Sequence, residues 1–228
     1  MKAPDIIIAV DGYSSTGKSS LARLLAGELG FIYLDSGAVY RAVTLFAIEN
    51  NLVRKDNTVS DLLKDELVHL DVHFDEKGQT CIGDRLVENK IRTMEVSSLV
   101  SPVAAVPFVR NYVDGRLHAM AESGRIVMDG RDIGTTVFPH AQLKIFMTAR
   151  VEVRAARRFD ELRAKGQNPA PEEVLKNIRE RDFIDSHRDT SPLVRAADSY
   201  LLDNSEMTIG EEIAWVKGLI QGKFSILE

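Results

Sequence analysis

Residues 12 to 20 combine two glycines, several hydroxyl side chains and one lysine at a spacing suited to binding phosphate groups. The run Gly-Tyr-Ser-Ser-Thr-Gly-Lys-Ser matches the phosphate-loop pattern, in which a glycine-rich turn joins a strand to a helix. Backbone N–H groups at a helix N-terminus can surround phosphate oxygens, and the glycines let the backbone approach them closely. Lys18 would add a cation, and Ser19 or Ser20 a hydroxyl on the magnesium side. The predicted nucleotide-binding residues are Gly12, Tyr13, Ser14, Ser15, Thr16, Gly17, Lys18, Ser19 and Ser20.

A second group of charged residues follows the apolar run Ile126 to Met128. Asp129 ends this run, where it would either take part in a metal shell or cap a loop. Arg131 and Asp132 come next, at the carboxyl end of the predicted strand. Open α/β sheets bind ligands along that edge, so we expect both side chains near a ligand.

Arginines are concentrated between residues 150 and 195, which hold eleven Lys or Arg and nine Asp or Glu. Four of them share one predicted helical face, and three further charged residues share a stripe of the next helix. These are Arg150, Arg154, Arg157 and Arg158, followed by Arg181, Asp185 and Arg188. Any single arginine has a structural alternative, in which it is solvated or paired with a nearby acid. For the set we favour a clamp on a transferring phosphoryl group, carried by a hairpin that closes over the nucleotide.

The segment Asp35 to Arg41 opens another predicted helix, with Ser36 as its expected cap. Capping explains Asp35 and Ser36 but leaves Arg41 without a role. We therefore expect a second anion site formed by Asp35, Ser36 and Arg41. Two anion sites beside one sheet edge would suit a kinase acting on a phosphorylated acceptor.

The elements that must position these residues alternate between strands and helices. Buried strands are expected at residues 6–10, 31–34, 126–128, 143–147 and 199–203, and a helix at 19–29 that ends at Gly30. This alternation predicts an α/β fold with a parallel sheet. Residues 68–87 break the rhythm and predict a small antiparallel meander, with turns at Lys77-Gly78 and Gly83-Asp84. Residues 165–171 predict a loop between two helices, with Pro171 opening the second.

Composition excludes several classes of protein. The 228 residues are 44% hydrophobic and 28% charged, which is typical of a globular chain and not of a disordered one. The net charge of −5 argues against a nucleic-acid partner. One cysteine, Cys81, fits a reducing compartment, and we find neither a signal peptide nor a membrane span, so we expect a cytoplasmic protein with no membrane partner. The five histidines show no metal-ligand spacing.

Taken together, these blocks resemble the bacterial cytidylate kinases, a family of nucleoside monophosphate kinases. The resemblance covers nearly the whole chain and rests on residues 12–20, 34–41, 91–96, 129–139, 181–182, 192–193 and 197–198. It implies a three-layer phosphate-loop kinase fold with a central parallel sheet, a small antiparallel insert and a helical lid. The implied division is a core of residues 1–62 and 104–228, with a lid at about 155–175, and an inserted CMP-binding subdomain of residues 63–103.

The resemblance also implies roles for individual residues. Ser36, Arg41, Arg131 and Arg188 would hold the acceptor phosphate, Ser101, Arg110 and Asp132 would contact the cytosine edge, and Arg181 and Asp185 would contact ribose and phosphates. Arg157 would belong to the lid over ATP, and the implied catalytic set is Lys18, Arg131, Arg157, Arg181 and Arg188. Ser19 would bind the magnesium ion, and Asp129 would bind it through water. A carboxylate such as Asp132 can accept from the cytosine amino group, which uracil lacks.

The predicted reaction is transfer of the ATP γ-phosphate to CMP or dCMP, with Mg²⁺, by a monomer. The loop departs from the family where Tyr13 to Thr16 replace a more usual Pro-Ser-Gly-Ala and where Ser19 replaces a frequent glycine. Two alternatives stay open. One is a kinase for UMP or another small metabolite. The other is a nucleotide-dependent switch, although the Asn89-Lys90 pair continues as Ile91-Arg92 and does not form the Asn-Lys-x-Asp element of guanine-binding switches.

Overall fold

The structure is a computed structural model that describes residues 5–54, 56–122 and 124–224. Two compact units divide the chain, and each is described by itself. Unit 1 comprises residues 1–34, 123–186 and 191–228, and unit 2 comprises residues 35–122 and 187–190. The predicted insert, residues 63–103, lies within unit 2.

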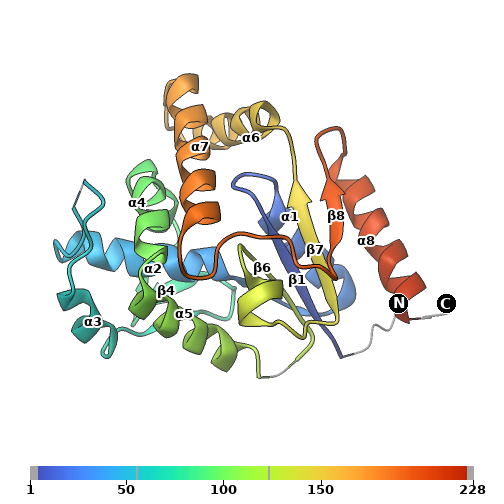
Figure 1. Ribbon diagram of the computed structural model, residues 1–228, viewed down its shortest axis with the longest axis horizontal. Coiled ribbons are helices and arrows are strands. Elements are labelled where there is room, and N and C mark those ends of the chain that lie inside the picture. Colours follow the sequence, from blue (N-terminus) through green and yellow to red (C-terminus); the bar gives the residue numbers. More distant parts are fainter. Residues whose placement is uncertain (1–4, 55, 123, 225–228) are drawn as a thin grey trace. The chain divides into compact units, whose positions relative to one another are not determined.

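A five-stranded sheet forms the centre of unit 1 (Figure 1). Its strands are β1 (Ile7–Gly12), β2 (Ile32–Asp35), β6 (Ile126–Gly130), β7 (Leu143–Thr148) and β8 (Tyr200–Asp203), in the order β2-β6-β1-β7-β8. β1 runs parallel to β6 and β7, and β7 runs parallel to β8. The five strands predicted from apolar runs are confirmed within one or two residues at each end, and so is the α/β kinase fold.

One face of this sheet is covered by α1 (Lys18–Leu29) and α8 (Ile209–Phe224). Leucines at helical spacing on α1 pack with Val216 and Ile220 of α8 and with β1 and β7. Gly30 adopts a left-handed conformation with φ 66° and ends α1 where the sequence predicted a stop. This packing holds the N-terminus of α1 at the carboxyl end of β1.

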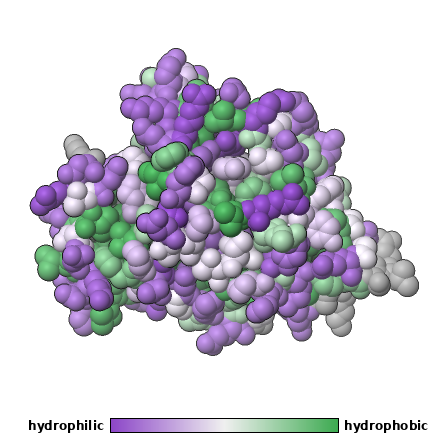
Figure 2. Space-filling view, in the orientation of Figure 1, coloured by the Kyte–Doolittle hydropathy of each residue, from purple (hydrophilic) through white to green (hydrophobic). Residues whose placement is uncertain are grey.

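The helical hairpin of unit 1 consists of α6 (Val151–Ala164) and α7 (Pro171–His187). Pro171 is the first residue of α7, as predicted, because its fixed φ and missing N–H suit the first helical position. The residues that α6 and α7 present toward the viewer in Figure 2 are mostly hydrophilic. A short π-helical turn, η2 (Ile133–Val137), follows β6.

Unit 2 combines helices with the predicted antiparallel meander. Its helices are α2 (Ser36–Glu49), α3 (Leu62–Leu67), the 3-10 turn η1 (Lys90–Arg92), α4 (Met94–Ala104) and α5 (Pro107–Met120). The meander is β3 (Val72–Phe74), β4 (Thr80–Ile82) and β5 (Arg85–Leu86), paired antiparallel in that order. Gly78 and Gly83 adopt positive φ in its two turns, which confirms the turn positions read from the sequence.

Candidate functional site

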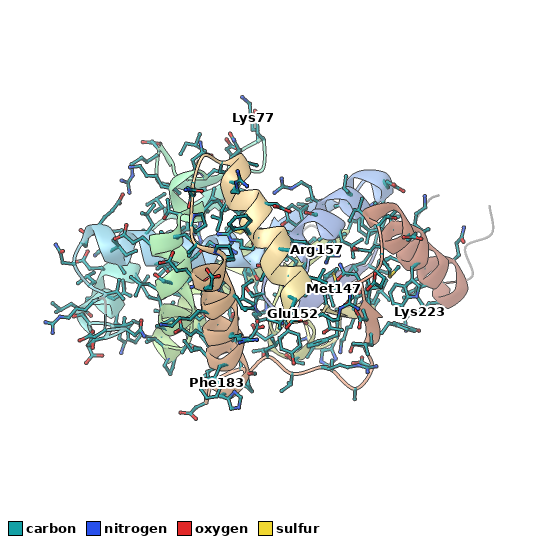
Figure 3. All side chains as sticks on the ribbon, turned by 90° about the horizontal axis from the view of Figure 1, so that it is seen from above. Lys77, Met147, Glu152, Arg157, Phe183 and Lys223 are labelled. Atoms are coloured by element: carbon teal, nitrogen blue, oxygen red, sulfur yellow. The ribbon has the colours of Figure 1, made fainter. Side chains whose placement is uncertain are left out.

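The loop between β1 and α1 has a backbone that requires glycine at both ends. Gly12 has φ 147°, and a Cβ atom there would lie 2.0 Å from the carbonyl oxygen of Met147, which Figure 3 labels. Gly17 has φ 93° and immediately precedes the first residue of α1. Because other residues rarely adopt these angles, the two glycines determine the curl of the loop at the helix N-terminus.

Lys18 folds back across this loop and is 5% exposed. Its Nζ donates to the carbonyl oxygen of Tyr13 at 2.6 Å and to Oγ1 of Thr16 at 3.4 Å. Burial, with help from the nearby Arg131 cation, holds the pKa of Lys18 well below its usual value. An added anion would relieve both effects, so the loop favours a negatively charged ligand.

Ser19 and Asp129 meet although they are far apart in the sequence. Ser19 Oγ donates to one carboxylate oxygen of Asp129 at 2.8 Å, and the hydroxyl of Tyr33 donates to the other at 2.8 Å. A hydroxyl and a carboxylate are the hard oxygen ligands that Mg²⁺ prefers. The donor set therefore fits Mg²⁺ bound mainly by water and phosphate oxygens. Within residues 5–54, 56–122 and 124–224 no group of three or more His, Cys, Asp or Glu could hold a metal by itself.

The four arginines predicted on one face of α6 have different partners in the structure. Arg150 pairs with Glu206, and Arg158 pairs with Glu161 at 2.7 Å. Pairing with an acid therefore describes Arg150 and Arg158. The four side chains do not form one common cationic face, because each contacts a different partner and Arg150 lies before the first residue of α6.

Arg154 and Asp182 tie the helical hairpin to the phosphate loop. Arg154 Nη1 donates to the carbonyl oxygen of Ser14 at 3.0 Å and to Asp182 at 2.5 Å, and its guanidinium lies 5.3 Å from the ring centre of Tyr13. The backbone N–H of Ser14 donates to the same Asp182 carboxylate at 3.1 Å. The sequence analysis considered Asp182 only as a possible structural partner of an arginine and gave it no role at the loop, because nothing in its local pattern separates it from the other acids of α7.

Arg157 also reaches the loop region, from the middle of α6 (Figure 3). Its guanidinium donates to the side-chain and backbone oxygens of Asn204, at 3.1 and 2.8 Å. Asn204 in turn donates to the carbonyl oxygen of Thr16 at 2.7 Å and to Glu212 at 2.8 Å. Asn204, a residue that the sequence analysis missed, therefore connects Arg157 to the end of the phosphate loop.

Arg131 and Asp185 form a close ion pair in unit 1. Arg131 Nε donates to Asp185 at 2.7 Å, and the side chains are 18% and 4% exposed. Burial alone would lower the pKa of Arg131, but the Asp185 carboxylate outweighs burial and raises it. Arg181 is also buried, on the same helix as Asp185. The prediction that Arg188 continues their helical stripe is wrong, because α7 ends at His187.

In unit 2 the start of α2 differs from the prediction by one residue. Asp35, not Ser36, is the N-cap, because its carboxylate accepts from the backbone N–H of Ala38 at 2.9 Å. Ser36 is the first residue of the helix. Arg41, one turn further on, lies 3.8 Å from the Asp35 carboxylate. The three residues predicted to form a second anion site are therefore neighbours, with the carboxylate acting as cap.

Arg92 anchors this helix start to the meander and was missing from the predicted site. Its Nη2 donates to Asp35 and to Glu88, both at 2.9 Å, and Glu88 accepts from the hydroxyl of Thr80 at 2.7 Å. Burial alone would raise the pKa of Asp35, but Arg92 and Arg41 outweigh burial and hold that pKa below its usual value. In the sequence, Arg92 could have been found from its place in the 91–96 block of the resemblance, to which no role was assigned.

Ser101 and Arg110, predicted to contact a base, are both buried in unit 2, at 2% and 1% exposure. Ser101 lies on α4 and Arg110 on α5. Arg110 donates to the carbonyl oxygen of Ala104 at 3.2 Å, and its guanidinium lies 5.4 Å from the ring centre of Tyr40. A guanidinium held in this way is ordered before any ligand binds.

Comparison with known proteins shows what this chain is similar to. The cytidylate kinase family model matches residues 8–221. A cytidylate kinase of Bacteroides fragilis is 53% identical over 216 residues, which is 92% of this chain and 94% of the relative. One from Flavobacterium psychrophilum is 47% identical over 220 residues, which is 94% of this chain and 97% of the relative.

A solved structure supports the fold alone. An uncharacterized protein from Eubacterium ventriosum is 11% identical, covers 96% of this chain and 99% of its own, and superposes with a TM-score of 0.52. In the part of the chain that the structure describes, the helices are too short or too polar to cross a membrane.

Proposed function

This chain belongs to the cytidylate kinase family, and from that premise we propose that it transfers the γ-phosphate of ATP to CMP or dCMP, giving ADP and CDP or dCDP in pyrimidine nucleotide metabolism. The observation that carries the proposal is the loop of unit 1, where two obligatory glycines precede α1 and a buried lysine is its first residue. It accounts for the donor, and the family accounts for the acceptor.

On the donor side, residues 12 to 20 would bind the ATP phosphates through backbone N–H groups and Lys18. Lys18 leaves two uncharged acceptors, Tyr13 and Thr16, when it turns to a phosphate, so little is lost in the exchange. Ser19 and Asp129 would hold Mg²⁺, directly or through water. When bound, the ion would neutralise part of the phosphate charge.

On the acceptor side, we propose ligands within each unit, taken separately. Arg131, Asp132, Arg181 and Asp185 belong to unit 1, and Asp35, Ser36, Arg41, Ser101, Arg110 and Arg188 belong to unit 2. Guanidinium groups would hold the acceptor phosphate, and Asp132 would accept from the cytosine amino group. Asp185 already orients Arg131, so the guanidinium needs little rearrangement to meet a phosphate.

The proposed mechanism is a direct in-line transfer. The acceptor phosphate is already anionic at neutral pH, so its attacking oxygen needs no strong general base. What the chain must supply is alignment of two anions and cations that offset their repulsion. Lys18 and Arg131 would supply charge, Arg181 and Arg188 would add to it, and Arg157 would hold the lid over ATP.

The proposal extends to a monomer in the cytoplasm with nucleotides as its only partners. Cys81 is the one cysteine of the chain, and a chain without a disulfide framework suits a reducing compartment. The net charge of −5 likewise disfavours a nucleic-acid partner.

A panel of acceptors tests the proposed function. Purified protein with ATP and Mg²⁺ would be given CMP, dCMP, UMP and AMP separately, and ADP release would be followed in a coupled assay. We expect CMP and dCMP to give the highest kcat/KM. Faster turnover of UMP or AMP, or ADP release that no acceptor stimulates, would overturn the proposal.

A further inference from the structure

Asp11 is a buried carboxylate directly before the phosphate loop that the proposed mechanism does not use. It lies on β1 between Gly130 of β6 and Phe146 of β7 and is 6% exposed. Its two carboxylate oxygens accept from the backbone N–H groups of Ile133 and Gly134, each at 2.7 Å. One side chain therefore binds two consecutive amides of a turn more than 120 residues away in sequence.

The turn that Asp11 holds is tightly enclosed. A Cβ atom on Gly134 would lie 3.3 Å from the Asp11 carboxylate and 3.1 Å from Cδ of Lys144. Lys144 is itself fixed, because its Nζ donates to the carbonyl oxygen of Pro139 at 2.7 Å and to Asp198. Both sides of the turn thus meet side chains with fixed positions.

The first residues of this turn follow immediately after two proposed acceptor ligands. Arg131 and Asp132 lie between β6 and the Ile133–Gly134 amides, so their backbone is held at both ends, by strand pairing before and by Asp11 after. Arg131 is aimed further by its bond to Asp185. The orientation of Asp132, which is 3% exposed, depends on the same backbone.

A carboxylate at this position is electrostatically unfavourable. Burial raises the pKa of Asp11 to about 6, and the nearby Asp132 adds to the rise, although the two amide hydrogen bonds oppose it. An asparagine would avoid the buried charge. Its amide, however, has one oxygen, and its NH₂ group would face the second backbone N–H. A carboxylate is the side chain that can accept both bonds.

We propose that Asp11 is a positioning residue that, through the Ile133–Gly134 amides, fixes the backbone of Arg131 and Asp132 and with it the acceptor selectivity. Asp11 lies on β1, the strand that leads into the phosphate loop. This inference rests on the proposed function, because it needs CMP to be the acceptor. It assigns Asp11 no contact with substrate. Asp11 acts through the backbone of the turn.

The Asp11→Asn variant provides the main test. We expect the kcat/KM ratio of CMP over UMP to fall about tenfold, which corresponds to about 1.4 kcal/mol, and KM for CMP to rise. The Kd of a non-hydrolysable ATP analogue should stay within about threefold, since the loop glycines and Lys18 are unchanged. A loss of turnover that leaves the CMP to UMP ratio unchanged would show a merely structural role and overturn the proposal.

Gly134→Ala approaches the same turn from the other side and guards against a failure of Asp11→Asn to fold. The added methyl would displace the turn by a few tenths of an ångström, so we expect the same ratio to fall about threefold. Gly27→Ala is the matched control, because a Cβ there meets nothing within 4 Å on the exposed side of α1. Equal CMP to UMP ratios in Gly134→Ala, Gly27→Ala and the wild type would overturn the proposal.

The two proposals fail in different ways. Wild-type protein that does not prefer CMP removes the proposed function and leaves Asp11 without a selectivity to set. Wild-type protein that prefers CMP, with variants that keep the preference, removes the role of Asp11 alone.

Discussion

The phosphate loop of unit 1 and the cluster of Asp35, Glu88 and Arg92 in unit 2 each contain a largely buried cation. The groups that accept hydrogen bonds from the two cations differ. Lys18 donates to a carbonyl and a hydroxyl oxygen, and its pKa is lowered by burial and by Arg131. Arg92 donates to two carboxylates, which outweigh the effect of burial and raise its pKa. A cation held by uncharged groups is ready to bind an anion, whereas one held by two carboxylates is part of the scaffold.

The largest effect that this comparison predicts is on Lys18. Lys18→Met should reduce kcat by about 10³-fold, because a charge aimed at the transferring phosphate is lost. The unfolding free energy should not fall, since a buried cation with uncharged acceptors is removed. Lys176→Met, at a lysine whose side chain is 75% exposed, is the control and should leave both quantities unchanged. Steady-state kinetics and urea unfolding measure them. A marked destabilisation of Lys18→Met would contradict the difference between the two cations.

Arg92→Met, unlike Lys18→Met, should lower the unfolding free energy. Removing the closest cation leaves the buried Asp35 carboxylate with the more distant Arg41 at 3.8 Å, so we expect the unfolding free energy to fall by about 3 kcal/mol. KM for CMP should rise about tenfold while the Kd of an ATP analogue stays constant. An unchanged unfolding free energy would show that Arg92 is not part of the scaffold.

The same variant gives a pH dependence with a definite sign. The pKa of folded Asp35 lies below its ordinary 3.8, so its ionised form stabilises the fold above that pH. This stabilisation disappears as the pH falls through the folded pKa. The difference in unfolding free energy between wild type and Arg92→Met should therefore be constant near neutral pH and shrink below about pH 4. A difference that grows on acidification would reverse the assignment.

A smaller effect is expected at Ser19. Ser19→Ala removes the hydroxyl that contacts Asp129, so the Mg²⁺ concentration for half-maximal turnover should rise about tenfold. Because Asp129 keeps its bond from Tyr33, the fold should be retained. Titration of Mg²⁺ at saturating nucleotide measures the shift. An unchanged Mg²⁺ requirement would remove Ser19 from the metal side.

The smallest effect is predicted at Arg150. If it is found, turnover depends on where a cation lies and not on how many cations the hairpin carries. Arg150 and Glu206 are exposed, at 58% and 77% of their side chains, so Arg150→Ala should change stability by less than about 0.5 kcal/mol and leave kcat unaffected. Thermal unfolding and the coupled assay suffice. A substantial loss of turnover would restore the interpretation of α6 as one cationic surface.

Local patterns in the sequence were sufficient for much of the fold and part of the site. The glycine loop, the strand before it, the stop at Gly30, the turns of the meander and Pro171 all depend on neighbouring residues, whose backbone preferences are short-range. Lys18, Ser19 and Asp129 were predicted as candidate site residues for the same reason, because each is read from the element it begins or ends.

Tertiary structure alone decided which distant partners the charged side chains meet. Asp182 contacts the amide of Ser14, Arg92 contacts Asp35, and Asp11 contacts the amides after Asp132, in each case across more than fifty residues. Even the end of α7, which leaves Arg188 outside the helix, was not evident from spacing. Spacing orders side chains along one element, whereas an ion pair or a held backbone amide depends on how different elements pack.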